Sequence, residues 1–209
     1  MSTTTPRAVR TAFAVLVTLV AVAVIGPWVA PRGTTAPDAL AAERLVPPSA
    51  AHPLGTDAAS RDVLARMVAG TSVSVSIAGI ALVVVVLVGA ACGGAAALGP
   101  RWLDRWLMGI VDAVLALPRI LVVLGLVTFT GRLGPAGLGV LLGLTGWAPM
   151  ARLVRGRLRE LEDADFVVAA RAVGAPPVTI FWRHLLPATG PAILAAATVT
   201  IATLSLIHI

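Results

Sequence analysis

The side chains that could do chemistry are few in this chain of 209 residues, and they stand apart from one another. His184 and His208 have no acidic or nucleophilic partner at a suggestive spacing, and the serines of the apolar segments have no His/Asp pair near them. The phosphate-binding pattern GxxxxGK(S/T) does not occur, so we expect no ATP site of that kind. The sequence therefore predicts no catalytic residue, no bound cofactor and no metal site. It favours a transport protein over an enzyme.

One loop holds ionisable residues at a spacing that metal ligands could use. His52 and Asp57 could both face a metal ion, but two residues in a loop are too few to define a site. The alternative, which we favour, is a structural turn in which Asp57 caps the helix that carries Arg61 to Met67. The residues of this HPLGTD motif are His52, Pro53, Leu54, Gly55, Thr56, Asp57, Arg61 and Asp62.

A carboxylate is also predicted in or near the membrane. Only 11 residues separate Arg119 from Gly131, too few to cross a bilayer, so a membrane segment must begin earlier, near Trp106, and include Asp112. An ionisable residue there is a candidate functional group. Alternatively, Asp112 and Arg119 lie seven residues apart on one helical face and pair with each other or snorkel. We favour this structural interpretation.

Composition sets the class of the elements that position these residues. Apolar residues make up 58% of the chain and charged residues 12%, against about 45–50% and about 25% in soluble domains. The sequence predicts an all-α, polytopic transmembrane helical bundle. The net charge of +6 comes from arginine spread over loops, which indicates membrane topology and contact with the lipid bilayer, and no nucleic-acid binding.

Five membrane spans are expected. A signal peptide is the alternative to the first, but Pro31 makes a poor cleavage site after Ala30, and we favour an uncleaved span. Ten arginines fall on the predicted inner side and five outside, which places the N-terminus in the cytosol. The spans are Thr11–Ala30, Ser72–Leu98, a segment from near Trp106, Gly137–Leu153 and Ala188 to about Leu206. The predicted regions are a cytosolic N-terminus and first span (1–30), an external loop (31–71) and a membrane core (72–205).

The core contains one long charged segment, residues 152–187, which we call the coupling loop. Its pattern predicts two short helices and a turn, a shape suited to docking. The first helix begins in an acidic stretch (Glu160, Glu162, Asp163, Asp165) and ends near Val173, with Arg171 in its last turn. Its apolar face is Phe166, Ala170 and Val173. Gly174 is expected in the left-handed conformation that ends a helix, and the second helix runs from about Pro177 to Leu186 and stops at Pro187.

The coupling loop resembles the "EAA" loop in membrane-spanning subunits of bacterial ABC importers. The matching residues are Ala169, Ala170, Gly174, Leu186 and Pro187, whereas Val168 and His184 depart from that pattern. The fuller string AARAVG…FWRHLLP is similar to the dipeptide/oligopeptide/nickel branch of the family. The HPLGTD motif resembles the same branch, with Ser60 in place of the usual glycine.

This resemblance implies a permease subunit in the bacterial plasma membrane, which forms the translocation path for short peptides or nickel complexes. The implied partners are two ATP-binding subunits, which hold the ATP, a sister or identical permease subunit, and an extracytoplasmic substrate-binding protein. Phe166, Ala169, Ala170 and Val173 would seat the loop on the ATPase, Gly174 would set the angle between its helices, and Arg171 would lie at the polar rim.

Two expectations concern the chain end and the competing functions. The resemblance covers roughly Val46 to Ser205, so we expect residues 206–209 to be an atypical, truncated end and a sixth span to be lost. A secondary transporter would couple ions through Asp112 and Arg119. A membrane-embedded hydrolase would need a nucleophile and a base, and no such pair is visible.

Overall fold

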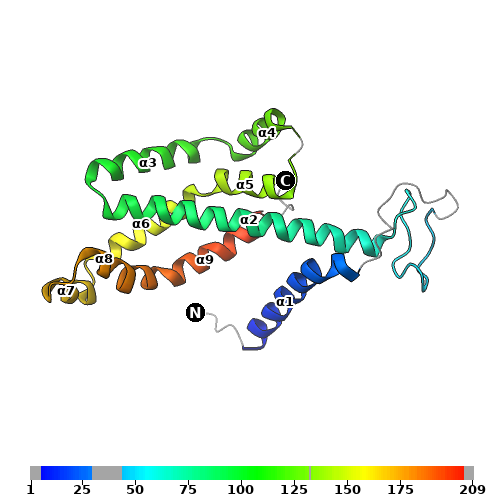
Figure 1. Ribbon diagram of the computed structural model, residues 1–209, viewed down its shortest axis with the longest axis horizontal. Helices are drawn as coiled ribbons and strands as arrows, with labels where there is room; N and C mark the ends of the chain where they lie inside the picture. Colours follow the sequence, from blue (N-terminus) through cyan, green and yellow to red (C-terminus); the bar gives the residue numbers. More distant parts are fainter. Residues whose placement is uncertain (1–5, 30–43, 132, 205–209) are drawn as a thin grey trace. The chain divides into compact units, whose positions relative to one another are not determined.

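The structure is a computed structural model, and it describes residues 6–29, 44–131 and 133–204 (Figure 1). The chain divides into two compact units, Met1–Ser76 and Ile77–Ile209. Within the described residues every regular element is helical, apart from one isolated β-bridge between Thr56 and Asp62. The predicted all-α class is therefore confirmed.

The first unit contains α1 (Pro6–Val29), a loop, and the first turns of α2 (Val63–Leu98). We expected a short helix and then a separate span from Ser72, but α2 is one helix of 36 residues. The hydroxyls of Thr71 and Ser72 donate to the carbonyls of Met67 and Val68, one turn back along the helix. These side chains are satisfied inside the helix, so they do not interrupt it.

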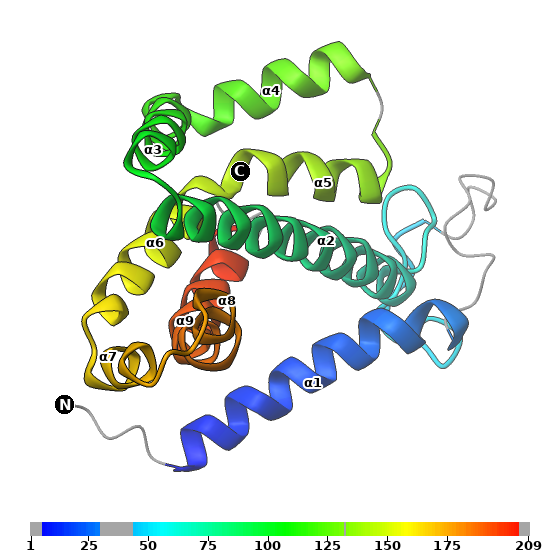
Figure 2. The ribbon, with the colours of Figure 1, turned by 60° about the vertical axis from the view of Figure 1, so that its left-hand side comes forward.

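The second unit holds the rest of α2 and the remaining helices (Figures 1 and 2). A break at Pro118 separates α3 from α4, and the two helices are bent by 86°. Leu117 and Pro118 both have extended backbones, and for Leu117 the reason is that a proline disfavours helical geometry in the residue before it. The elements are α3 (Arg101–Ala116), α4 (Arg119–Thr130), α5 (Pro135–Gly146), α6 (Ala148–Glu162), α7 (Asp165–Ala172), α8 (Pro177–Ile180), a π-helical turn η2 (Phe181–Leu185) and α9 (Leu186–Leu204).

Among the described residues, two helices are long and apolar enough to cross a membrane: α2 and the continuous stretch Val178–Thr203. Two bent pairs, α3 with α4 and α5 with α6, raise the number of candidate spans to four. The protein is thus a polytopic helical membrane protein. The first of the five predicted spans corresponds to α1, whose described apolar part, Val17–Gly26, is shorter than a span, so that span stays a prediction. The end at 206–209 and part of the 31–71 loop lie outside the described residues.

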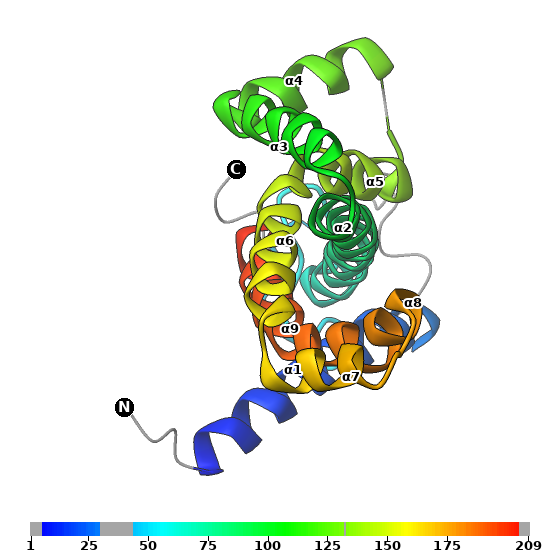
Figure 3. The ribbon, with the colours of Figure 1, turned by 90° about the vertical axis from the view of Figure 1, so that its left-hand side faces the viewer.

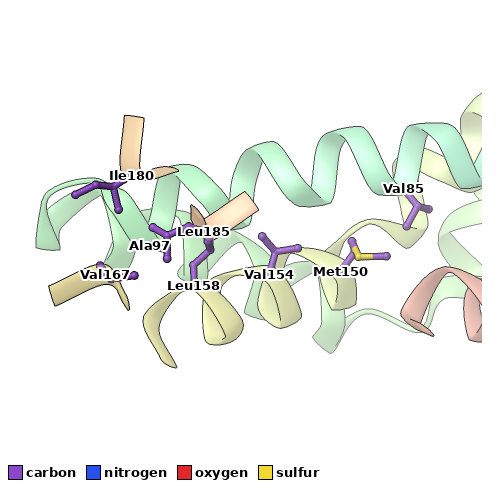
Figure 4. Packing of buried hydrophobic residues seen from close by; sticks show 8 residues of the cluster. All are labelled: Val85, Ala97, Met150, Val154, Leu158, Val167, Ile180 and Leu185. Atoms are coloured by element: carbon purple, nitrogen blue, oxygen red, sulfur yellow. The ribbon is translucent and has the colours of Figure 1, made fainter. Parts of the chain in front are cut away.

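The core of the second unit lies where α6 packs against α2 and carries α7 at its far end (Figures 3 and 4). Glycines let the backbones approach: a Cβ at Gly93 of α2 would collide with the carbonyl oxygen of Ala151, and one at Gly89 would lie 2.6 Å from the Cβ of Met150. Close approach through small residues is how membrane helices pack. The buried side chains are Val85, Ala97, Met150, Val154, Leu158, Val167, Ile180 and Leu185.

Candidate functional site

The coupling loop is built largely from the ends of longer helices. The sequence predicts Glu160 and Glu162 in the first turns of the first coupling-loop helix, and this is wrong: both belong to the last turn of α6, which ends at Glu162. Buried Val154 and Leu158 fix α6 in the core, so its helix continues to that point. Only Asp165 lies in the first turn of α7.

The C-terminus of α7 has the predicted geometry. Gly174 has a φ of 79°, in the left-handed region. Its N–H donates to the carbonyl of Arg171 and the N–H of Ala175 donates to the carbonyl of Ala170, each at 3.0 Å. These two bonds form a Schellman motif, which satisfies the last carbonyls of the helix. Arg171 lies in the last turn of α7, as expected.

The helix that follows does not stop at Pro187, contrary to our expectation. α8, η2 and α9 form one continuous stretch, and the N–H of Leu186 bonds to the carbonyl of Phe181, five residues back. A proline inside a helix clashes with the carbonyl four residues before it. The wide π turn directly before Pro187 alters this spacing, so the helix continues through the proline. Such π turns are frequent at functional sites.

The apolar face of α7 differs from the predicted one. Val167 is fully buried and packs against the cluster that contains Leu158, Ile180 and Leu185 (Figure 4). Ala170 is half-buried against the same cluster, whereas Val173 is 84% exposed. Periodicity could not select the anchor, because four apolar residues follow one another from Phe166 to Ala169.

The exposed part of α7 is a small surface. Phe166 is 43% exposed and Ala169 is exposed as well. The ring of Phe166 also approaches that of His184 in η2, with 6.3 Å between the ring centroids. Leu186 is half-buried and Pro187 is exposed. Val167 therefore fixes α7 on the core, while Phe166 and Ala169 stay accessible on its other side.

In the HPLGTD motif, Asp57 holds its own loop together. Its carboxylate accepts the N–H groups of Ala59 and Arg61 at 2.8 and 3.0 Å. It also accepts the guanidinium groups of Arg61 and Arg66 at 3.0 and 2.5 Å. The pKa of Asp57 falls to about 2, mainly because of the Arg61 backbone N–H and further because of Ala59 and the two guanidinium groups. The side chain is therefore a structural anion.

The helix cap that we assigned to Asp57 belongs to Asp62. The Asp62 carboxylate accepts the N–H of Ala65 at 3.0 Å, at the start of α2. The reason is that α2 begins at Val63, five residues beyond the start we expected from Asp57 as the cap. The ring of His52 bonds to the same Asp62 carboxylate at 2.9 Å, so His52 and Asp57 contact different partners.

Between His52 and Asp62, two residues have backbones that favour glycine. Gly55 has a φ of 72°, and a Cβ there would collide with the carbonyl oxygen of Val46. Ser60 has a φ of 59°, which gives a physical reason for the glycine that the resembling family has at this position. Thr56 forms the isolated β-bridge with Asp62, and it also exchanges hydrogen bonds with the backbone of Val46. Pro53 and Leu54 are exposed.

The ion network predicts how this loop responds to acid. Because the folded pKa of Asp57 is below its ordinary 3.8, its stabilising contribution is complete above that value and is lost as the pH falls through about 2. We expect pepsin to cleave residues 44–62 increasingly between about pH 4 and about pH 1.5. Asp57→Asn, which has no charge to lose, should show a flatter profile, and equal profiles for both proteins would contradict the assignment.

The predicted pair of Asp112 and Arg119 is not formed. Asp112 lies on α3 and binds Arg152 of α6 at 2.5 Å, whereas Arg119 begins α4 and donates to the carbonyl of Leu142 at 2.9 Å. The two residues do not share a helical face, because the chain breaks at Pro118 between them. The geometry that would support ion coupling through this pair is therefore not formed.

Comparisons with known proteins agree on one family. Residues 86–207, more than half of the chain, match the family described as "Binding-protein-dependent transport system inner membrane component". The chain is 35% identical to the dipeptide transport system permease protein DppC of Bacillus subtilis over 190 residues, which is 90% of this chain and 58% of DppC. It is 33% identical to the nickel transport system permease protein NikC of Escherichia coli K12 over 193 residues, 92% of this chain and 69% of NikC.

A third relative is the glutathione transport system permease protein GsiD of Pectobacterium atrosepticum, 35% identical over 67% of this chain and 46% of GsiD. The chain spans about half the length of several of the curated relatives that it matches. The match covers the coupling loop, α7 and Gly174 included. The chain therefore belongs to the inner-membrane components of binding-protein-dependent transport systems, the permease subunits of ABC importers, in their dipeptide and nickel branch.

Proposed function

We propose that this chain is one of two permease subunits that form the translocation path of an ATP-driven importer for short peptides or nickel complexes. The observation that carries the proposal is α7: an eight-residue helix fixed by Val167 and ended by Gly174, with Phe166 and Ala169 exposed. A helix held in this way can follow a groove in an ATP-binding subunit as that subunit closes. The identity to DppC and NikC supports the substrate class.

In this function the chain supplies the path and its partners supply the energy and the substrate. ATP binds to two partner subunits, and this chain holds no cofactor of its own. A sister or identical permease subunit completes the path. An extracytoplasmic binding protein delivers the substrate.

The proposal is tested by assembling the importer in proteoliposomes with its ATP-binding subunits, its second permease subunit and its binding protein. We expect ATP-dependent uptake of a labelled dipeptide or of nickel ions. We also expect the ATP-binding subunits to co-purify with this chain, and to be lost when the exposed surface of α7 is made acidic by Ala169→Glu. Uptake of neither probe, in an importer that still hydrolyses ATP, would reject the substrate class.

The orientation predicted from the arginine distribution is that the N-terminus and α7 face the cytosol and the HPLGTD motif faces outside. In a Cys92→Ala background, an impermeant thiol reagent added to intact cells should label a cysteine at Ala58 and miss one at Asp163. Both positions are exposed, so accessibility within the protein is matched. Labelling of the cysteine at position 163 alone would show that the true topology is the reverse of the predicted one.

A further inference from the structure

One face of α6 is charged and is bound to α3. Arg152, Arg155 and Arg159, spaced three and four residues apart, all reach carboxylates of α3. Asp104 accepts two hydrogen bonds from Arg155, the one from Nη2 at 2.7 Å, and a third from Nη2 of Arg159 at 3.0 Å. Asp112, further along α3, accepts a hydrogen bond from Arg152.

The two contacts differ in strength. The side chain of Asp104 is 13% exposed, and it is held by both arms of the Arg155 fork. Bidentate arginine–carboxylate pairs of this kind are strong, and they fix the orientation of the two side chains. The side chain of Asp112 is 66% exposed, and among the described residues it accepts a single hydrogen bond, from Arg152. Beside the Asp112 pair, Val111 of α3 and Ala151 of α6 are fully buried in a small apolar cluster. Asp104 is therefore the main fastening between α3 and α6.

This fastening lies between the docking helix and a bent part of the membrane core. On one side, α6 leads through Asp163 and Ala164 to α7, and Leu158 of α6 packs in the same cluster as the α7 anchor Val167. On the other side, α3 leads through the break at Pro118 to α4, which packs beside α5 (Figure 2). A displacement of α7 can therefore reach α6 through packing, and it can reach α3 through Asp104 together with the apolar contact around Val111.

We propose that Asp104 is a positioning residue for transport, and that its ion cluster with Arg155 and Arg159 transmits movement of α7 to α3 and α4. The inference rests on the proposed function and adds to it the route from the docking site into the membrane core. Without the carboxylate, α6 still moves with α7, and α3 keeps the apolar contact around Val111 and the Asp112–Arg152 pair, so it follows α6 less closely.

The first test compares substrate transported per ATP hydrolysed, with a labelled dipeptide and nickel ions as the two probes. Asp104→Asn should lower this ratio roughly tenfold, within the range seen when a mutation weakens coupling between distant sites. The exchange Asp104→Arg with Arg155→Asp keeps one carboxylate between two guanidinium groups and should restore the ratio. Arg157→Gln is the matched control, because Arg157 pairs with Glu160 within α6 itself. An unchanged ratio in Asp104→Asn would overturn the inference, and so would a lowered ratio that the exchange does not restore.

A second test does not depend on transport. In a Cys92→Ala background, spin labels at the exposed positions Leu124 of α4 and Val168 of α7 report the distance between these helices. Asp104→Asn should broaden the distance distribution and the exchange should narrow it again, whereas a distribution unchanged by Asp104→Asn would overturn the inference. If the wild-type importer moves neither probe, the proposed substrate class fails, and the label distances still decide whether Asp104 fastens α3 to α6.

Discussion

Replacement of Gly174 by valine is expected to lower transport per ATP hydrolysed by roughly tenfold and to weaken co-purification of the ATP-binding subunits. The φ of Gly174 is 79°, a conformation in which a β-branched residue is strained by about 1–3 kcal/mol. Among the described residues, no atom other than those of the adjacent residues lies within 4 Å of the position that a Cβ would occupy, so the penalty comes from the backbone. The strain is relieved when the turn between α7 and α8 opens.

Opening this turn changes the docking helix itself. The Schellman bonds of Gly174 and Ala175 to α7 are lost, and Phe166 and Ala169 no longer face the partner at the same angle. The helices of the membrane core are expected to remain folded, since Gly174 is exposed and outside them. Transport and coupled ATP hydrolysis in proteoliposomes, together with co-purification, measure the effect.

Two variants separate the backbone effect from the added bulk. Gly156 is an exposed glycine inside α6 with no atom near its Cβ position, so Gly156→Val adds the same side chain without a left-handed backbone. It should couple normally. Gly174→Asn should keep much of the coupling, because asparagine adopts positive φ more readily than valine. Normal coupling in Gly174→Val would show that Gly174 is only an exposed turn residue.

The features of the site that were predictable from sequence are local ones. The left-handed backbone of Gly174 follows from the residues around it: a helix with Arg171 in its last turn, then glycine, then Pro176 and Pro177. The all-α class likewise follows from composition. Such signals need no knowledge of distant parts of the chain, and the structure confirms both.

The features that sequence reasoning missed depend on contacts far along the chain. Val167 is buried because Leu158, Ile180 and Leu185 meet there, and the run of apolar residues in α7 does not say which one is the anchor. The fastening of Asp104 joins residues 51 and 55 positions apart, and nothing in the spacing of the charges marks it. The sequence also predicts a helix end at Pro187, whereas the helix continues there. The π turn before it, which lets it continue, could not be recognised from the sequence.

The largest effect on folding is expected from Gly93→Ala, which adds a single methyl group to α2. The new Cβ would collide with the carbonyl oxygen of Ala151 and lie 3.0 Å from the backbone N of Arg155. These are backbone atoms of α6, which cannot turn aside as a side chain can. Overpacking of this kind destabilises by typically about 1–3 kcal/mol. The yield of folded protein and its melting temperature in detergent should both fall, as measured by size-exclusion chromatography after heating.

The control for this variant is Gly79→Ala in the same helix. Alanine favours a helix over glycine by about 1 kcal/mol in soluble hosts, and this gain applies equally at both positions. Outside the adjoining helix backbone, no atom of the described residues lies within 4 Å of a Cβ at Gly79, so only the gain remains there, and the melting temperature of Gly79→Ala should not fall. Val154→Ala should fail to rescue Gly93→Ala, because the collision is with the α6 backbone and with the Cβ of Val154, which alanine retains. Full rescue by that change would show that α6 can shift, and that the close approach of α2 and α6 does not require glycine.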